Sequence, residues 1–465
     1  MAARVAVVGG GISGLSAAWA LSGLGHEVTV FEAAAEVGGK LRRESVAGFP
    51  IDVGAESILA RRPEGLALID ELGLTDAVVH PQTITAGLRV GGRRRAMPAH
   101  TMMGIPADLD ALRSADVLTD HGLERVAGEP GLPPLPPLTD DVSVGDLVRD
   151  RLGNEVADRL VEPLLGGVYA GRADALSLRA TMPVLAAELA EGGSLIEAAG
   201  RVVARGSRNP ATGPVFASLQ GGVGRLPVEL VGAGRFEVQS GVTVRAVRRT
   251  PAGFALEIGA VPDSRLVEFD GVVLAVPAAK AARLLRSLAP AAAAELDAVE
   301  TASMAIASFA FSGIELPAGS GLLVGMREGL AVKAVTVSSQ KWSLETGGLT
   351  MLRASVGRIG ESQVLQRDDA DLIQLVRHDL LELLGVAAEP VDAIVTRWGG
   401  GLPQYGVGHI ERVARIRAAL DAVPGLGICG ATFDGIGIPA CIATARAAAA
   451  VVHGSLQGRA PAAGE

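Results

Sequence analysis

The first stretch of the chain alternates between short apolar runs and helix-spaced apolar positions, a pattern typical of a βαβ unit. Residues 5–8 are an apolar run of the kind found in buried parallel strands. A glycine-rich turn at 9–14 follows, and apolar side chains then recur at helical spacing over 15–24. A second strand-like run, 27–31, ends at Glu32. The pattern therefore predicts a strand, a helix and a second strand at the start of a parallel sheet.

The rest of the chain continues with helices and strands in separate blocks. A Pro-rich stretch at 130–137 is expected to be extended and to separate two packed pieces. Ser143 has the spacing of a helix N-cap before the helical positions of 147–164, and a hairpin is expected at Gly91-Gly92. Further helices are predicted at 182–203, 369–384, 409–421 and 438–453. Strands are predicted at 242–244, 254–258, 272–276 and 426–429, with strands of a second sheet within 303–311, 321–338 and 349–355.

The first turn carries a G-x-G-x-x-G pattern formed by Gly9, Gly11 and Gly14. Glycines at this spacing allow a tight turn, close approach of the backbone to a pyrophosphate, and packing of the helix on the strand. The N-terminus of the helix also attracts an anion. Glu32 would accept a hydrogen bond from a ribose hydroxyl, and its charge disfavours the 2′-phosphate of NADP. A merely structural turn would explain the glycines alone, but the strand, helix and Glu32 around them favour a dinucleotide site.

A second glycine pair, Gly38-Gly39, follows closely and precedes Lys40 and Arg42. A loop so near the ribose carboxylate is able to approach the same dinucleotide, and either cation would add positive charge toward its phosphates. The alternative for these cations is an ordinary loop with solvated side chains. Because plain NAD dehydrogenases need no long second loop, the combined spacing favours FAD.

A glycine-rich turn at 430–439 precedes the last predicted helix. Backbone N–H groups at that helix start would meet the pyrimidine edge of a flavin and stabilise charge at N1 of the reduced ring. A plain strand-to-helix turn is the alternative. Asp434 in this turn is predicted to be a surface or capping carboxylate. Cys441 is predicted to be a small buried apolar residue rather than a nucleophile or a flavin tether.

Together these elements predict an α/β fold with α+β insertions. We expect a discontinuous Rossmann-like FAD-binding domain, a mixed-sheet substrate domain and a helical insertion. The predicted segments are 1–80, 213–285 and 420–465 for the FAD-binding domain, 81–212 for the mostly helical substrate or insertion domain, and 286–419 for the substrate-binding sheet.

Composition excludes several classes of protein. The 465-residue chain has a formal net charge of −9 and no long basic run, so no nucleic-acid partner is expected. The seven histidines show no metal-ligand spacing, so no metal site is expected. Two cysteines permit no disulfide framework and favour a reducing, cytoplasmic compartment. With no signal-peptide layout and no apolar run of about 18 residues, no spanning helix is expected. Peripheral membrane contact and the choice between monomer and homodimer stay open.

Several longer motifs carry a family resemblance over nearly the whole chain. The N-terminal pieces resemble the flavin amine oxidase and phytoene desaturase superfamily. The segment 151–171, which ends in EPLLGGVYAG, LSLR at 176–179, PQYxxGH at 403–409 and GIG at 435–437 together resemble the protoporphyrinogen and coproporphyrinogen oxidases of haem synthesis. MGIP at 103–106 is similar to the soluble Gram-positive coproporphyrinogen III oxidases.

The resemblance implies non-covalent FAD and assigns its contacts residue by residue. Val244 would bind the adenine through its backbone. The implied FAD contacts are Gly9, Gly10, Gly11, Ile12, Ser13, Gly14, Glu32, Ala33, Lys40, Gly54, Ala55, Glu56, Ser57, Val244, Trp398, Gly430, Gly435, Ile436 and Gly437.

The implied reaction is the oxidation of coproporphyrinogen III to coproporphyrin III, with O₂ as acceptor and H₂O₂ as product. Six electrons and six protons leave the substrate, two electrons at a time through the flavin. Because aromaticity drives the sequence, no strong side-chain base is required. Gly167 would lie against the macrocycle, where its carbonyl orients or accepts from a pyrrole N–H. The alternative is that Gly167 only permits close packing.

The four propionates of coproporphyrinogen need cationic partners, since a guanidinium pairs with a carboxylate in a bidentate manner. A solvated surface position is the alternative for each candidate. The family's protoporphyrinogen enzymes often place an Arg shortly before a Gly-Gly hairpin, and Ala86 stands there in this chain, which favours coproporphyrinogen. The candidates are Arg61, Arg62, Arg93, Arg94, Arg95 and Arg179.

Four other functions compete with this interpretation. Protoporphyrinogen IX oxidation is the alternative within the same family. A flavin amine oxidase would need an aromatic cage, yet aromatic residues make up only 3% of the chain. A carotenoid desaturase would need a longer apolar membrane-facing surface. A non-catalytic relative is disfavoured by intact glycine motifs at both ends of the chain.

Overall fold

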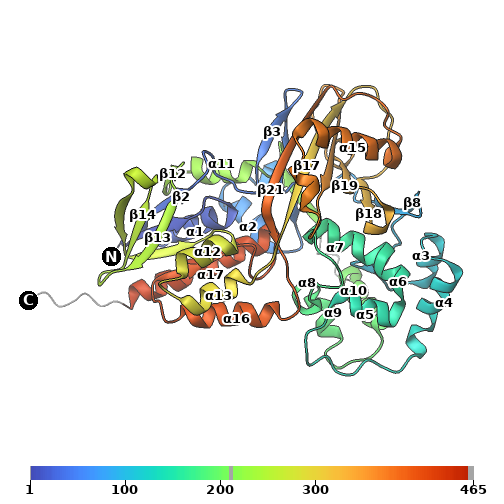
Figure 1. Cartoon of the computed structure of the whole chain (residues 1–465), viewed down its shortest axis with the longest axis horizontal. Coiled ribbons are helices and arrows are strands. Elements are labelled where there is room, and N and C mark those ends of the chain that lie inside the picture. The colour runs from blue at the N-terminus through green and yellow to red at the C-terminus, as the bar shows by residue number, and fades with distance from the viewer. Residues whose placement is uncertain (1, 209–212, 459–465) are drawn as a thin grey trace, which may run out of the picture.

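The computed structural model describes residues 2–208 and 213–458, so the ends of the predicted segments at 1, 209–212 and 459–465 lie outside it. One half of the molecule is built on a five-stranded parallel sheet (Figure 1). Its strands come from the beginning, the middle and the end of the chain. In sheet order they are β12 (Glu237–Ser240), β2 (Glu27–Glu32), β1 (Arg4–Val8), β16 (Gly271–Leu274) and β22 (Leu426–Ile428).

Both faces of this sheet are covered, which explains why its central strands are continuous apolar runs. On one face α1 packs against α17. The helices of that face are α1 (Ile12–Gly23), α2 (Pro63–Glu71), α11 (Arg225–Gly232) and α17 (Ile438–Gln457). The other face carries a three-stranded antiparallel sheet and three helices. They are β13 (Val244–Arg249), β14 (Phe254–Ile258), β15 (Arg265–Phe269), α12 (Ala278–Leu285), α13 (Pro290–Asp297) and α16 (His409–Leu420).

A seven-stranded mixed sheet forms the second half of the molecule (Figure 1). Helix α15 (Asp369–Leu384) covers one face with Leu372, Val376 and Leu380. In sheet order the strands are β21 (Asp392–Pro403), β17 (Thr301–Phe311), β20 (Thr350–Val356), β19 (Val332–Val337), β18 (Gly321–Val324), β7 (Ala86–Val90) and β8 (Arg93–Ala96). The opposite face of this sheet lines a cavity through Ile306, Thr336 and Ser355.

A helical part lies beside this sheet, coloured teal and green in Figure 1. Ser143 caps α5 as predicted, since its Oγ accepts a hydrogen bond from the Asp146 N–H at 3.0 Å. A π-helical turn at 157–161 interrupts the helix that leads into α7. The helices are α3 (Leu109–Ser114), α4 (Asp120–Gly128), α5 (Val144–Leu152), α6 (Asn154–Val156), α7 (Glu162–Tyr169), α8 (Leu178–Thr181), α9 (Pro183–Glu188) and α10 (Leu195–Arg208).

One more short helix, α14 (Ser338–Lys341), precedes β20, and several short strands lie elsewhere in the chain. They are β3 (Arg43–Val46), β4 (Phe49–Asp52), β5 (Ile58–Leu59), β6 (Val78–Val79), β9 (Thr101–Met102), β10 (Ile105–Pro106) and β11 (Phe216–Leu219). Met103 and Gly104 of the MGIP motif turn between β9 and β10, and a methyl group at Gly104 would meet Leu160 O at 2.6 Å. This motif is therefore packed closely against the helical part.

The predicted α/β class is confirmed, and most predicted elements are present. The helix predicted over 182–203 is wrong in one respect: α9 and α10 are separate, because Gly192 and Gly193 turn the chain with positive φ. The predicted hairpin at Gly91-Gly92 joins β7 to β8. These strands fall within the predicted helical segment 81–212 yet extend the seven-stranded sheet. The domain boundaries stay a prediction.

A buried ion pair ties the Pro-rich stretch to the helical part. Glu129 is fully buried and accepts hydrogen bonds from Arg151 Nε (2.8 Å), Ser194 Oγ (2.5 Å) and Leu195 N (2.9 Å). Burial alone would raise the pKa of Glu129, but hydrogen bonds from Ser194, Leu195 and Arg151 lower it. Arg151 is itself only 5% exposed, so each charge depends on the other.

Replacing Glu129 by Gln is expected to lower the free energy of unfolding by about 3–5 kcal/mol, because Arg151 would keep its charge without its partner. Chemical denaturation measures this loss. Glu411→Gln is the matched control: Glu411 pairs with Arg179 at the surface, and such pairs contribute about 1 kcal/mol or less. Equal losses in both variants would contradict the assignment.

Candidate functional site

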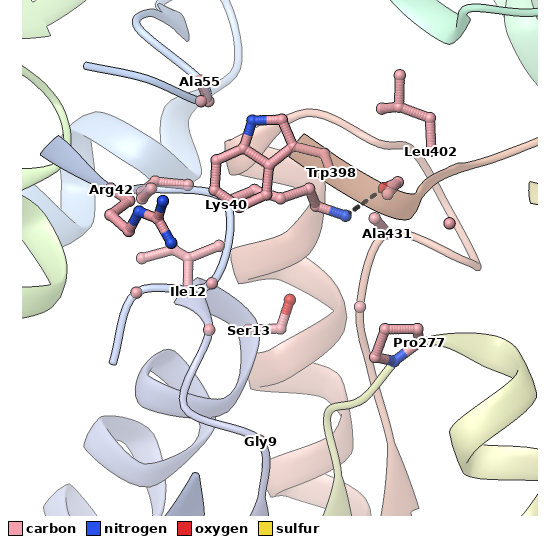
Figure 2. Close-up of a pocket in the computed structure, with 18 of the residues that line it drawn as sticks. Gly9, Ile12, Ser13, Lys40, Arg42, Ala55, Pro277, Trp398, Leu402 and Ala431 are labelled. Atoms are coloured by element: carbon pink, nitrogen blue, oxygen red, sulfur yellow. Dashed lines mark hydrogen bonds between the residues drawn. The ribbon is translucent and has the colours of Figure 1, made fainter. Parts of the chain in front are cut away.

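A cavity of about 1100 Å³ lies where the parallel sheet, the mixed sheet and α7 meet. The carboxyl ends of β1, β2 and β16 contribute Val8, Phe31 and Ala275 to its wall, which is where open parallel sheets bind ligands. The mixed sheet contributes Thr336 and Ser355. Figure 2 shows the part of this cavity between the two sheets.

The first glycine turn needs its glycines for two different reasons. A methyl group at Gly9 would meet Ala275 O at 2.5 Å, and one at Gly14 would meet Gly9 O at 1.8 Å. These two positions therefore permit close packing of strand and helix. Beside Gly11 the nearest atom would be Gly39 Cα at 4.0 Å, so Gly11 keeps the backbone open to the cavity. Gly11 is also the N-cap of α1 and offers no side-chain acceptor, which leaves N–H groups of the first turn free.

Glu32 holds this turn in place. Its Oε2 accepts a hydrogen bond from Gly10 N and its Oε1 accepts one from Ala34 N, both at 2.7 Å. Each carboxylate oxygen has a further lone pair, so Glu32 is still able to accept from a ligand hydroxyl. The predicted ribose-binding residue thus lies in the cavity wall and also orders the glycine turn.

The second loop is bonded to the first and to the mixed sheet. Gly38 N donates to Gly10 O at 2.8 Å. Lys40 Nζ donates to Gly401 O at 2.5 Å, and Figure 2 shows its side chain running alongside the Trp398 indole with this bond dashed. Burial lowers the pKa of Lys40. The solvated loop considered for Lys40 is therefore wrong, whereas Arg42 lies half in solvent with its guanidinium 5.3 Å from the Trp398 ring centre.

Glu56 and Arg353 of the cavity wall form a network with Lys341, which lies outside that wall, and sequence reasoning missed this network. Glu56 accepts from Lys341 Nζ at 2.5 Å and from Arg353 at 2.8 Å, and Arg353 also donates to Gly54 O at 2.6 Å. Burial alone would raise the pKa of Glu56, but the two cations lower it. The network carries one net positive charge. An arginine between Leu352 and Ala354 in an apolar strand was the available signal.

The C-terminal turn is fixed by a residue of the PQYxxGH motif. Tyr405 is buried, and its hydroxyl donates to Ala431 O at 2.6 Å and accepts from Gly435 N at 2.9 Å. The His409 ring stacks on Tyr405 with 4.0 Å between ring centres. Gln404 Nε2 donates to Tyr169 O at 2.8 Å, which links the same motif to the end of α7. This motif therefore positions two walls of the cavity at once.

The last helix begins at this turn. Gly437 is the N-cap of α17 and lines the cavity without a side-chain cap. Asp434 is confirmed as a surface carboxylate, paired with Arg417 at 2.5 Å. Cys441 is confirmed as a small buried residue, and burial raises the pKa of its thiol. Its position in the cavity wall was not predicted.

All but three of the residues predicted to contact the cofactor line this cavity. The exceptions are Gly10, Gly14 and Gly435, which lie behind the cavity wall. Gly10 N donates to Glu32, Gly14 packs on Gly9, and Gly435 N donates to the Tyr405 hydroxyl. Their contact with a cofactor stays a prediction.

Gly167 also lines the cavity, at the end of α7. A methyl group there would meet only the flexible Leu323 side chain, at 3.3 Å, so close backbone packing does not explain the glycine.

The arginines predicted to bind propionates lie elsewhere. None of the six candidates lines the cavity, and Arg62, Arg95 and Arg179 are instead paired with Glu64, Asp116 and Glu411. These positions agree with the solvated surface alternative, because charge alone does not say which surface a side chain faces. The cavity is lined instead by Lys40, Arg42, Lys280, Arg283, Arg353 and Arg397.

Ala86 is the position at which the family's protoporphyrinogen enzymes often carry an arginine. Ala86 begins β7 and does not line the cavity. The preference for coproporphyrinogen inferred from this position therefore stays a prediction.

Comparison with known proteins shows which protein family has a cavity of this kind. Residues 12–453 match the family described as flavin containing amine oxidoreductase. The chain belongs to this family. The coproporphyrinogen III oxidase of Mycobacterium leprae is 39% identical over 94% of this chain and 96% of its own. The human protoporphyrinogen oxidase is 30% identical over 98% and 99% of the two chains. A crystal structure from Exiguobacterium sp. 255-15, provisionally assigned as a protoporphyrinogen oxidase, has 32% identity and a TM-score of 0.86 over 98% of this chain and 99% of its own.

The cavity of this flavin oxidoreductase fits a flavin dinucleotide. Two helices, α1 and α17, begin at its wall with glycine N-caps that carry no side-chain acceptor. Free N–H groups at such ends bind phosphate and other electronegative groups. The volume of about 1100 Å³ lies at the upper end of the roughly 300–1,000 Å³ of ligand pockets, which suits a ligand as large as a dinucleotide.

Two further findings concern the described residues alone. No helix among them is both long and apolar enough to cross a bilayer. In the same part of the chain, no three His, Cys, Asp or Glu side chains are grouped so that they could hold a metal ion.

Replacing Tyr405 by Phe is expected to weaken flavin binding about 10- to 100-fold, because buried Ala431 O and Gly435 N would lose their shared partner and the turn would loosen. Titration of flavin-free protein with the cofactor, read by flavin fluorescence, measures the change. Tyr169→Phe is the control, since no hydrogen bond of the Tyr169 hydroxyl is found in the described structure. If Tyr405→Phe binds flavin as tightly as this control, the turn does not depend on the hydroxyl.

Proposed function

We propose that this protein is an oxygen-dependent oxidase with non-covalently bound FAD that converts coproporphyrinogen III to coproporphyrin III. The observation that carries the proposal is the placement of Gly167. The segment EPLLGGVYAG ends in the cavity that both glycine turns line, and Gln404 of the second motif bonds it there. The similarity of the Mycobacterium leprae oxidase over nearly its whole length supports the same substrate.

The chain supplies one set of contacts to each part of the dinucleotide. The free N–H groups at the start of α1 take the diphosphate, Glu32 takes a ribose hydroxyl, and the backbone of Val244 takes the adenine. The start of α17 at Gly437 takes the pyrimidine edge. When bound, FAD supplies hydride acceptance from a bridging carbon of the porphyrinogen and electron transfer to O₂. Burial keeps Cys441 a protonated thiol, so it does not serve as a tether.

The remaining wall holds the porphyrinogen in place. The carbonyl of Gly167 orients a pyrrole N–H, and the mixed sheet presents Ile306, Ala334 and Thr336 as a smooth surface. Because the product gains aromaticity, the protein needs to orient the substrate and exclude competing reactions rather than provide a strong base. Arg42 and Arg397 line the cavity with side chains 40% and 35% exposed. They pair with Glu44 and Asp369, and their remaining N–H groups suit carboxylates that reach toward solvent.

Protoporphyrinogen IX oxidation is the second candidate. The human protoporphyrinogen oxidase covers nearly the whole chain, although at lower identity than the mycobacterial relative. The substrates differ in carboxylate number, so the rim cations decide between them. Coproporphyrinogen, with more carboxylates, makes fuller use of Arg42 and Arg397.

The holoenzyme is expected to form porphyrin in air, with release of H₂O₂, faster from coproporphyrinogen III than from protoporphyrinogen IX. Porphyrin fluorescence gives both initial rates. Gly167→Leu should reduce kcat/KM about 100-fold because its side chain would displace the substrate. Gly167→Ala is the matched control and should retain more activity, since its methyl group meets only Leu323. Undiminished turnover in Gly167→Leu would remove Gly167 from the substrate site.

A further inference from the structure

Lys333 occupies a β-bulge in β19 beside the cavity. Val332 pairs with Val356 and Ala334 pairs with Ser355, so Lys333 is an extra residue between two consecutive partners of β20. A bulge breaks the alternation of a strand and redirects one side chain. Ala334 lines the cavity, whereas Lys333 is aimed at α7.

The redirected side chain reaches the turn that ends in the cavity. Lys333 Nζ is 3.3 Å from Gly166 O, and the residue is only 1% exposed. Gly166 directly precedes Gly167, so the two share a peptide whose carbonyl is the acceptor of this bond. The same carbonyl accepts from Ala170 N at 3.0 Å, where Ala170 closes the helix in the left-handed region with a φ of 51°.

For the stability of the fold alone, burial of this lysine is unfavourable. Within the described structure no carboxylate lies at ion-pair distance from its ammonium group. The charged neighbours are engaged with others: Arg358 pairs with Glu361 at 3.4 Å, Glu162 of α7 accepts from Ala173 N, and Asp379 of α15 accepts from Val332 N. A buried ammonium without an ionic partner is destabilising, and an apolar residue of similar volume would be better for stability.

We propose that Lys333 is a positioning residue, whose hydrogen bond to Gly166 O fixes the Gly166–Gly167 peptide against which the porphyrinogen binds. The proposal rests on the proposed function, because it assigns the bond a purpose only if the porphyrinogen lies on Gly167. This role explains both the bulge that redirects Lys333 and the burial of its ammonium group without an ionic partner.

The bond is expected to depend on pH. Burial first, and Arg358 second, lower the pKa of Lys333 to about 7, while Glu361 acts in the opposite direction. Below that pH the ammonium donates strongly to Gly166 O, and above it the neutral amine donates weakly. Porphyrin binding should therefore weaken as the pH rises through about 7. Stability should change in the opposite direction, because the unfolded chain holds this proton up to about pH 10 and the folded chain does not.

The test compares Lys333→Met with the wild-type holoenzyme. Removal of the donor should raise KM for coproporphyrinogen III and Kd for coproporphyrin III about tenfold at pH 6. The melting temperature should be equal or higher, and the rise in wild-type stability between pH 7 and pH 9 should disappear. Porphyrin fluorescence and thermal denaturation measure these quantities. Unchanged KM and Kd would overturn the proposal.

Two further variants separate positioning from general loss of structure. Val335→Ala, on the same strand and in the core under α15, should lower stability but leave Kd unchanged. Lys333→Arg keeps a charge that does not titrate near neutral pH, so it should bind porphyrin with a Kd independent of pH from 6 to 9. If Val335→Ala shifts Kd as much as Lys333→Met, Lys333 has no positioning role. A wild-type holoenzyme that oxidises neither porphyrinogen would instead refute the proposed function, and the inference with it.

Discussion

The structure depends on the hydrogen bonds of one motif, PQYxxGH, which joins walls of the cavity that are far apart in sequence. The Tyr405 hydroxyl bridges Ala431 O and Gly435 N, and Gln404 holds the carbonyl of Tyr169. The motif follows the last strand of the mixed sheet and precedes α16, which packs on the parallel sheet. One short segment thus sets the distance between the C-terminal turn and the end of α7, and a ligand in the cavity meets both.

The charged side chains around this cavity differ in how deeply they are buried and in which groups they bond. The chain is acidic overall, yet six cations line the cavity together with four glutamates, Glu32, Glu36, Glu44 and Glu56. The Glu56 network alone contributes one net positive charge. Lys40, which is half-buried, and Lys333, which is buried, donate to main-chain carbonyls, Gly401 O and Gly166 O. In an environment with little water such bonds are stronger than at the surface. The protein therefore uses Lys40 and Lys333 to fix backbone at the site, whereas Arg42 and Arg397 reach solvent.

Much of the site could be predicted from short segments of the sequence, because its glycine turns are formed by residues that are close together along the chain. The glycines at 9–14 and at 430–437 and the carboxylate at Glu32 act through backbone conformation and through residues next to them. Their spacing is therefore readable along the chain. The propionate partners could not be read in this way, since the candidates Arg93, Arg94 and Arg95 lie on β8 at the sheet edge, away from the cavity. Strand alternation gives the side of a sheet that a residue faces, but not what lies against that side.

The sequence by itself determined the α/β class, the glycine turns and the family-specific segment at 162–171. Each of these depends on consecutive residues that require a particular backbone conformation. Only the tertiary structure decided which cations face the cavity, that Glu56 joins Lys341 and Arg353, and that a bulge aims Lys333 at α7. These contacts connect residues up to about three hundred positions apart, as from Glu56 to Arg353. Their geometry arises from sheet register and packing, which no local pattern of the chain records.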